Sequence, residues 1–543
     1  MRSRSFLFAA LAGALGSLVA TTPVAFADDE DDYEEEELEG DGPEAEAVKL
    51  FGIDELIDVA VRRSPDLVRA RVDRVVAKGN AGAAGANQQW TMSMGAQYKQ
   101  NAIGEQVQVQ PFEIVRTDTL DASIGLGRNL PTGGSFSVEA GVNRTFREYN
   151  IDLTLLEQAT GTANAGQPAA QAGADPYQDK FTRLQSTARA TLKQPLVRGF
   201  GPDVALAPQK KADYELAAST VQAQLAAEDM VREIVTGYWE LAYATYAVDT
   251  RAEGVALAEG QEKLTREELR AGKTAQNAVN AVIYEIAVRQ EAYLTAQLDA
   301  EKKSLDLRRK VGLGLGRREI LMRPKQALEI GEYEWDIEEV LAQSRKANRK
   351  LATLALQKKV ADVDVKVAKN ATLPQVDVSL SGAVLGGGDT TGEAFSALGS
   401  SSGYEVMAGL SVSFELSGAA KSAHSAAVAR KKRLEVDRLD LERQIDAEVV
   451  NAVKAVTAAR TRVALSDKAI QVAEENVRAE RLNFTAGKTT NFSVMQRQGE
   501  LIEARLRRGR AVADYHVAVA QLQYLSGTIL DQYRVNTRPS KAR

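Results

Sequence analysis

The hydrophobic positions of this chain follow two periods, and the longest stretches follow the helical one. In residues 204–270 and 417–485 apolar side chains recur among many charges, and Pro208, near the start, is the one proline. At a rise of about 1.5 Å per residue, each stretch predicts a helix roughly 100 Å long. Such a helix exceeds an ordinary globular core and needs a coiled partner. Its apolar residues are mostly alanine and valine, which favours a wetted wall over a solid bundle.

Four shorter stretches also predict helices. Residues 53–87 and 337–369 precede strand-like sequence, whereas residues 274–311 and 489–525 follow the long helices. Each is about half the length of a long helix at the same rise per residue. We therefore expect two short helices, stacked end to end, to line each long one.

The second period is an alternation of apolar with small polar residues, which is typical of strands that expose one face. We expect such strands at residues 89–94, 187–194, 375–381 and 407–414. In an exported protein this alternation also fits transmembrane barrel strands, apolar towards lipid and polar towards the lumen. A soluble sandwich gives the same pattern, so the alternation alone leaves both open.

An additional hairpin is predicted before the first long helix. Residues 120–126 and 136–142 alternate on either side of the turn sequence Pro-Thr-Gly-Gly at 131–134. A stretch rich in alanine, glycine, glutamine and asparagine follows at 157–175, where we expect a long surface loop.

The sequence Ala-Gly-Lys-Thr occurs at 271–274 and again at 486–489, each time between a long helix and a shorter one. Strand, long helix, tight turn and return helix are thus present twice, which indicates a duplicated wall rather than a catalytic domain. We expect a first repeat at 49–316, a linker at 317–333, a second repeat at 334–530 and a tail at 531–543.

The N-terminus predicts export. Arg2 and Arg4 precede an apolar run, and Ala25-Phe26-Ala27 supplies a small-residue cleavage pattern, so residues 1–27 are expected to be a signal peptide. The following segment, 28–48, contains thirteen acidic residues, the last of them Glu46, and no lysine or arginine. Such a segment repels itself and is expected to be disordered.

Several function classes are disfavoured by composition. The chain has no cysteine, and its two histidines, His424 and His516, are far apart, so a metal site, a cofactor site or a catalytic triad is not expected. The Gly-Leu-Gly-Leu-Gly run at 312–316 follows a helix, which favours a helix stop over a phosphate loop. No basic stripe with interleaved aromatics predicts nucleic-acid binding. We expect no enzyme.

The ordered set of motifs resembles the TolC-like outer-membrane efflux proteins. Residues 53–57 (Ile-Asp-Glu-Leu-Ile) and 64–67 (Ser-Pro-Asp-Leu) resemble that family's first helix, and residues 194–201 resemble its link from strand to long helix. The turns at Gly272 and Gly487 resemble its two helix-hairpin tips. The resemblance covers nearly all of the chain between the acidic segment and the tail.

The resemblance implies an α+β membrane protein. Three copies would form a transmembrane β-barrel in outer-membrane lipid, continuous with a long periplasmic α-helical tunnel and built from two repeats per chain. It further implies a passive duct for efflux or type I secretion, which works with a periplasmic adaptor and an inner-membrane transporter. One chain has too few strands to close a lumen, so closure shared among chains agrees with this expectation.

The resemblance also implies where the duct is gated. The tip turns, with Gly272, Lys273, Gly487 and Lys488, would contact the adaptor, although both lysines are equally compatible with simple exposure to water. Acidic residues often line the family's constriction, but Ser493 and Gln496 occupy the matching positions here. Arg497 lies beside them, either as a charge that reverses the local sign or as a member of an ion pair in the wall.

Three questions stay open at this point. A periplasmic coiled-coil protein with a soluble β domain is the alternative to a duct, and a periplasmic hydrolase is remote. The substrate is not readable from the sequence, since drugs, metal ions, siderophores and secreted proteins all use such ducts. The barrel has twelve strands per trimer if the extra hairpin is an extracellular extension, which we expect, and eighteen if the hairpin spans the membrane.

Overall fold

The structure, a computed structural model, describes residues 48–102, 108–109, 112–151, 177–314, 321–331, 335–399 and 403–535. The expected signal peptide (1–27) and nearly all of the acidic segment (28–48) lie outside these residues. So do the loop expected at 157–175, part of the linker (317–333) and most of the tail (531–543). These expectations stay predictions.

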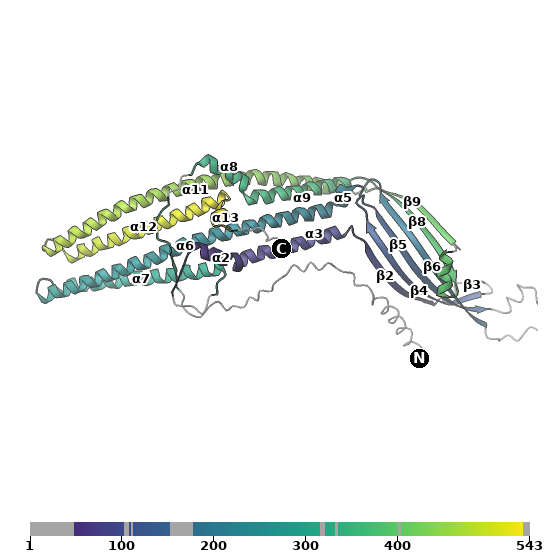
Figure 1. The fold of residues 1–543 in the computed structure, drawn as a ribbon, viewed down its shortest axis with the longest axis horizontal. Coiled ribbons are helices and arrows are strands. Elements are labelled where there is room, and N and C mark those ends of the chain that lie inside the picture. Colours follow the sequence, from purple (N-terminus) through teal and green to yellow (C-terminus); the bar gives the residue numbers. More distant parts are fainter. Residues whose placement is uncertain are drawn as a thin grey trace, which may run out of the picture.

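Two long helices run through an elongated molecule that ends in a curved sheet (Figure 1). They are α6 (Ala207–Arg270) and α11 (Ala419–Thr485), and both lie in the stretches that the sequence predicts. Towards the tips, α7 (Gln276–Val311) packs on α6, and α12 (Asn491–Leu525) packs on α11 and on α6. Contacts between α6 and α12 join the two hairpins into one wall.

The halves of the long helices nearer the sheet have other partners. They are α3 (Pro65–Ala86), on α6, and α9 (Arg349–Ala371), which contacts both α6 and α11. Each is preceded by a short helix, α2 (Ile53–Arg63) or α8 (Ile337–Ala347). The prediction that short helices line each long one end to end is confirmed. In the described part of the chain, no helix is both long and apolar enough to cross a membrane.

The largest hydrophobic core surrounds the middle of α6. Tyr238 of α6, Leu56 of α2 and Leu307 of α7 are buried in it, and the parallel ribbon of β1 (Val48–Phe51) and β7 (Leu321–Pro324) closes one side. The short helix α13 (Ile529–Gln532) packs against this core.

Near the tips the buried apolar cluster is much smaller and consists of Ala258, Val282, Ile286 and Met495. Local stability follows the amount of buried apolar contact. The tips therefore have much less buried apolar contact than the middle of α6.

In the described residues the sheet is antiparallel and contains six long strands in one continuous order, β2-β4-β5-β6-β8-β9, with the short β3 (Gln108–Val109) paired to β4. The strands are β2 (Thr91–Ala102), β4 (Phe112–Asn129), β5 (Ser135–Ile151), β6 (Tyr177–Pro195), β8 (Gln375–Gly388) and β9 (Gly403–Ser413). The short α5 (Pro202–Ala205) follows β6 and leads into α6.

The expectation that the extra hairpin is an extension beyond the sheet is wrong. The hairpin, β4 and β5, lies inside the sheet between β2 and β6, and β4 pairs with every residue of β2. Its turn, at residues 130–134, lies at the end of the sheet that joins the helices. An inserted antiparallel hairpin leaves the directions of the flanking strands unchanged, so the sequence is compatible with either position.

One face of the sheet is apolar across all six strands, because residues in register share a face. Met94 lies beside Ile124, Ile124 beside Ala140, and Ala140 beside Ala188, and the same row continues to Val384 and Tyr404. The opposite face carries mainly small polar and charged residues, among them Ser93, Asp121, Asn143, Arg189, Ser379 and Ser411.

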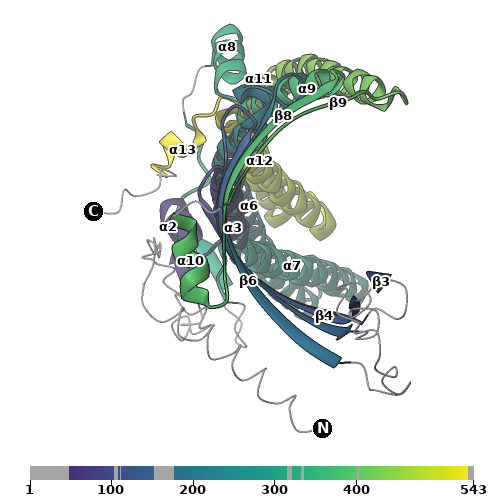
Figure 2. The same ribbon diagram turned by 90° about the vertical axis from the view of Figure 1, so that its right-hand side faces the viewer.

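The apolar face is the convex one. Figure 2 shows the sheet as an arc with α10 (Thr391–Gly399) against its outer side. Ser186 of β6 donates a hydrogen bond of 2.5 Å to the carbonyl oxygen of Ala394 in α10, and Ser186 lies in register with Gly386 on that face. The concave face is therefore the polar one.

Candidate functional site

The two Ala-Gly-Lys-Thr turns lie at the same end of the molecule, opposite the sheet (Figure 1). Each closes its long helix in the same way. Gly272 has φ +66° and Gly487 has φ +71°, a left-handed conformation that glycine adopts without steric cost. The N–H of Lys273 donates to the carbonyl of Glu268 at 2.8 Å, and that of Lys488 to the carbonyl of Asn483 at 2.9 Å.

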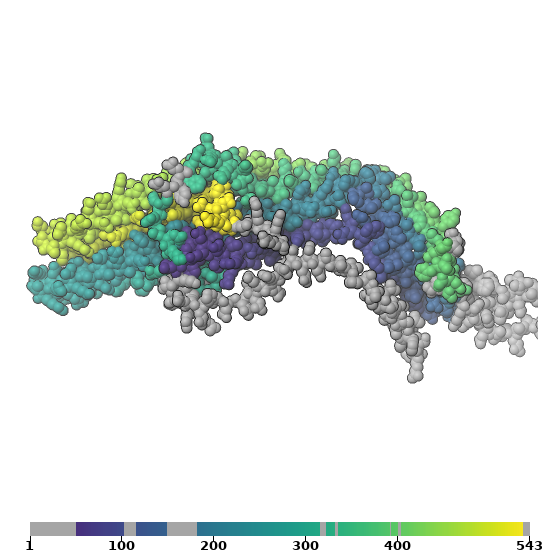
Figure 3. All heavy atoms as spheres, viewed as in Figure 1, coloured from purple at the N-terminus to yellow at the C-terminus, as the bar shows by residue number. Residues whose placement is uncertain are grey.

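These bonds form Schellman motifs, which satisfy the last carbonyls of a helix and reverse the chain. The repeated sequence thus gives both hairpins a tip turn of the same backbone geometry. Both lysine side chains are exposed at the ends of the hairpins. Figure 3 shows the hairpin ends as two separate lobes.

The first two turns of α12 contain the residues expected at the constriction. Thr490 caps the helix by accepting a hydrogen bond from the N–H of Ser493 at 3.4 Å. Gln496 is exposed, and Arg497 is partly exposed beside it. The structure therefore brings Ser493, Gln496 and Arg497 together near the tip.

Sequence reasoning missed the carboxylate in this group. Glu500 accepts hydrogen bonds from Arg497 at 2.8 Å and from Gln496 at 3.4 Å. The bond to Glu500 raises the pKa of Arg497, so the guanidinium stays charged. The spacing of three residues, from Arg497 to Glu500, was the signal for this pair. The local charge at this part of α12 is thus balanced within the helix.

Arg289 of α7 links three helices close to the tip. Arg289 is only 8% exposed, and its guanidinium donates to the carbonyl oxygen of Gly254 in α6 at 3.1 Å and to that of Met495 in α12 at 2.9 Å. The carboxylate of Glu285, one turn earlier in α7, neutralises it at 3.0 Å. Asn491, at the start of α12, also donates to the hydroxyl of Thr265 in α6. These contacts hold one hairpin against the other.

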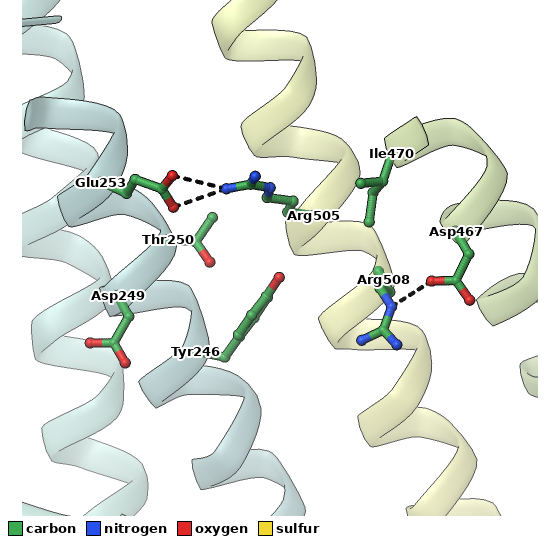
Figure 4. Close-up of a pocket in the computed structure, with 8 residues that line it drawn as sticks. All are labelled: Tyr246, Asp249, Thr250, Glu253, Asp467, Ile470, Arg505 and Arg508. Atoms are coloured by element: carbon green, nitrogen blue, oxygen red, sulfur yellow. Dashed lines mark hydrogen bonds and ion pairs between the residues drawn. The ribbon is translucent and has the colours of Figure 1, made fainter. Parts of the chain in front are cut away.

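Further from the tip, two arginines of α12 line a cleft of about 400 Å³ between α6, α11 and α12 (Figure 4). Arg505 binds Glu253 of α6 at 2.9 Å and Glu474 of α11 at 3.1 Å. Arg508 donates to Asp467 of α11 at 2.5 Å. Since the charges are paired across helices, this cleft is best understood as a polar seam between the hairpins.

The histidines do not form a reactive group with each other. His516 of α12 stacks on Trp239 with ring centroids 3.6 Å apart, and burial lowers its pKa, while His424 lies near the start of α11. Among the residues that the structure describes, no cluster of three or more histidines and carboxylates could hold a metal ion.

The architecture is that of solved outer-membrane channels. The CmeC outer membrane channel of Campylobacter jejuni matches with a TM-score of 0.63 at 12% identity, over 88% of this chain and 85% of that chain. VceC of Vibrio cholerae matches with a TM-score of 0.60 at 15% identity, over 88% and 96%. The open state of the MtrE channel of Neisseria gonorrhoeae gives 0.59 at 13% identity, over 90% and 95%. At these identities the likeness establishes the fold.

A family model also matches part of the sequence in the second half of the chain. Residues 340–528 match the model described as "Outer membrane efflux protein". No curated protein matches the chain. The resemblance to TolC-like outer-membrane efflux proteins is thereby confirmed over residues 340–528, and the fold of the chain agrees with it.

Proposed function

We propose that this protein is the outer-membrane channel of a tripartite efflux or type I secretion system. It would act as a passive duct, with no chemistry of its own. The observation that carries the proposal is the sheet with one continuous apolar face, whose strands lead directly into long, charge-rich helix hairpins. Such a sheet suits lipid on its outer face, and the hairpins suit a wetted tunnel.

The proposed assembly is a homotrimer in outer-membrane lipid, with the helices in the periplasm. Each chain would supply two repeats, 49–316 and 334–530, joined by the linker 317–333. Sharing the barrel among chains is supported by the edges of the sheet. In the described residues β2 pairs only with β4 and β9 only with β8, so each leaves one row of backbone groups for another chain.

The proposed partners act at the tips. A periplasmic adaptor would contact the turns with Gly272, Lys273, Gly487 and Lys488, which are the most projecting part of the wall. An inner-membrane transporter would supply the energy and choose the substrate. The duct would open when the hairpins move apart, a change between two packed arrangements that the adaptor favours.

The proposed constriction is the first part of α12. Ser493, Gln496 and Arg497 would line it, together with Glu500. Because Arg497 and Glu500 neutralise each other, we expect weak charge selectivity instead of the cation preference of an acidic ring. The contacts of Arg289 and Asn491 would hold this region closed.

Membrane fractionation followed by a mass measurement in detergent tests the proposal. We expect the mature protein in the outer-membrane fraction, extractable only with detergent, with the mass of three chains. A protein that is recovered in the soluble periplasmic fraction without detergent would instead support a coiled-coil spacer with a soluble β domain. The exposed apolar row, which includes Met94, Val406 and Leu410, opposes that alternative.

A further inference from the structure

The extra hairpin of β4 and β5 is an integral part of the wall. Every residue of β2 from Thr91 to Ala102 pairs with β4, and β5 pairs with β6 along its whole length. In the described residues β2 pairs with β4 alone, so these two strands join β2 to the rest of the sheet. The described sheet of one chain is therefore one continuous set of six long strands.

The same two strands carry the apolar face without interruption. Ile124 and Leu126 of β4 and Val138 of β5 are 41–49% exposed on the convex side, in register with Met94 and Met92 of β2. A hairpin in water beyond a membrane has no reason to expose such a row. The pattern fits strands that face lipid at the same depth as their neighbours.

The base of the hairpin is built into the junction with the helices. Arg128 of β4 donates to the carbonyl of Gln88 at 2.8 Å, just after α3. The N–H of Gly201 donates to the carbonyl of Thr132 in the turn at 3.0 Å. A Cβ on Gly133 would lie 2.0 Å from the carbonyl oxygen of Gly199, so the turn fits only as glycine. The segment that links β6 to the long helix thus packs closely against this turn.

We propose that three copies of this chain close a barrel of eighteen long strands, six from each, and that its exit admits polar cargo too wide for a twelve-stranded barrel. This inference rests on the proposed function and specifies its pore. Barrel diameter grows roughly linearly with strand number, so the barrel would be about 1.5 times as wide as one of twelve strands.

The perimeter of an eighteen-stranded barrel also matches that of the proposed helical tunnel. At each level one chain offers four helices, which are α3, α6, α9 and α11 near the sheet and α6, α7, α11 and α12 near the tips. Twelve helices at spacings of about 10 Å have a perimeter of about 120 Å. Eighteen strands, about 4.8 Å apart and tilted by about 45°, give about 120 Å, whereas twelve give about 80 Å. The tunnel then meets the barrel without narrowing.

Electron cryomicroscopy of the detergent-purified oligomer, viewed along its symmetry axis, tests the inference. We expect a ring of eighteen strands that includes β4 and β5. A ring of four strands per chain, with β4 and β5 outside it, would overturn the inference and leave the proposed duct intact. A protein that forms no oligomer, or no ring of strands, would overturn the proposed function itself.

Cysteine labelling gives an independent readout in the intact chain, because the native sequence has no cysteine. Ser123→Cys and Ile124→Cys are neighbours in β4 on opposite faces of the sheet. In lipid we expect a membrane-impermeant polar maleimide, added on both sides, to label Ser123→Cys at least tenfold faster than Ile124→Cys. Equal rates would place the hairpin in water on both faces and contradict a spanning β4.

Deleting residues 112–151 tests the width directly, since β2 and β6 remain antiparallel and can pair. In planar bilayers, polyethylene glycols of graded size are added on the barrel side. We expect the radius at which the polymer no longer enters to fall about 1.5-fold in the deletion variant. An unchanged cut-off would overturn the inference, and if the variant does not fold, the labelling and imaging experiments still decide it.

Discussion

The guanidinium of Arg289 in α7 donates a hydrogen bond of 2.9 Å to the main-chain carbonyl oxygen of Met495 in α12. This bond joins the first helix hairpin to the second at a place where the buried apolar cluster is small. Together with the hydrogen bond of Asn491 to Thr265, this bond contributes polar cohesion between the two hairpins near the tips. In the proposed duct, this bond would belong to the closed arrangement, and an adaptor or a mutation could remove it.

Arg289→Ala is expected to favour an open tip. The change leaves the carbonyls of Gly254 and Met495 without this donor, and hydrogen bonds to charged groups contribute about 1.5–3 kcal/mol each. Single-channel recording should show a higher open fraction or conductance, by about tenfold or more. Arg266→Ala is the matched control, because Arg266 pairs only with Glu262 of its own helix in the contacts described. Equal behaviour of the two variants would contradict a latch at Arg289.

Arg497→Ala is expected to make the channel prefer cations. The substitution removes the charge that neutralises Glu500, so an uncompensated carboxylate remains near the proposed constriction. Reversal potentials in a salt gradient should shift towards the cation limit. The double variant with Glu500→Gln should restore the native value, and a shift that persists in it would place the selectivity elsewhere.

Gly133→Ala is expected to loosen the β4–β5 turn. Its φ of +91° is strained for alanine, and the added Cβ would collide with the carbonyl of Gly199 at 2.0 Å. Strained backbone alone costs on the order of 1–3 kcal/mol, and the collision adds to it. Gly201→Ala separates the two causes, since Gly201 has φ +96° and open space around its Cβ position. The midpoint of thermal unfolding should fall further for Gly133→Ala than for Gly201→Ala. An equal fall in the two variants would argue against close packing of the turn on Gly199.

Glu228 is expected to make stability fall as pH rises from about 5 to 8. Burial raises its pKa from 4.5 to about 7, although Arg349 lies 3.2 Å away and opposes that shift. Between pH 4.5 and about 7 the folded chain holds a proton on Glu228 that the unfolded chain has released. The contribution of Glu228 to the free energy of unfolding is therefore complete below about pH 4.5 and is lost as the pH rises through about 7. Thermal unfolding of Glu228→Gln should lack this component, which amounts to a few kcal/mol at most. A pH profile identical to that of the native protein would contradict the shift.

Much of the architecture could be predicted from local pattern. Helical periodicity locates α6 and α11, and the Ala-Gly-Lys-Thr sequence identifies both tips, because only the glycine suits the left-handed position of a Schellman motif. Alternation also identifies the face of each strand. These features depend on neighbours in sequence, so a single sequence is sufficient to read them.

The rest depends on contacts between distant residues. β2 could pair with β4 or with β6, because both strands run antiparallel to it. Nothing in the sequence of residues 120–126 decides between these two pairings. Arg289 reaches Met495 in another hairpin, and neither residue is distinctive in sequence. The family's pattern does not predict Glu500, because its acidic positions match Ser493 and Gln496, whereas this carboxylate lies one turn further along α12.

The claim that this protein is a duct is tested most directly by the conductance of the purified protein in planar lipid bilayers. The native protein should insert and give small discrete current steps, because the contacts of Arg289 and Asn491 hold the tips together. Arg289→Ala with Asn491→Ala should give larger and longer steps in the same bilayers. If both proteins insert as folded oligomers and neither conducts ions, the molecule is not a duct, and its helices and sheet serve another purpose.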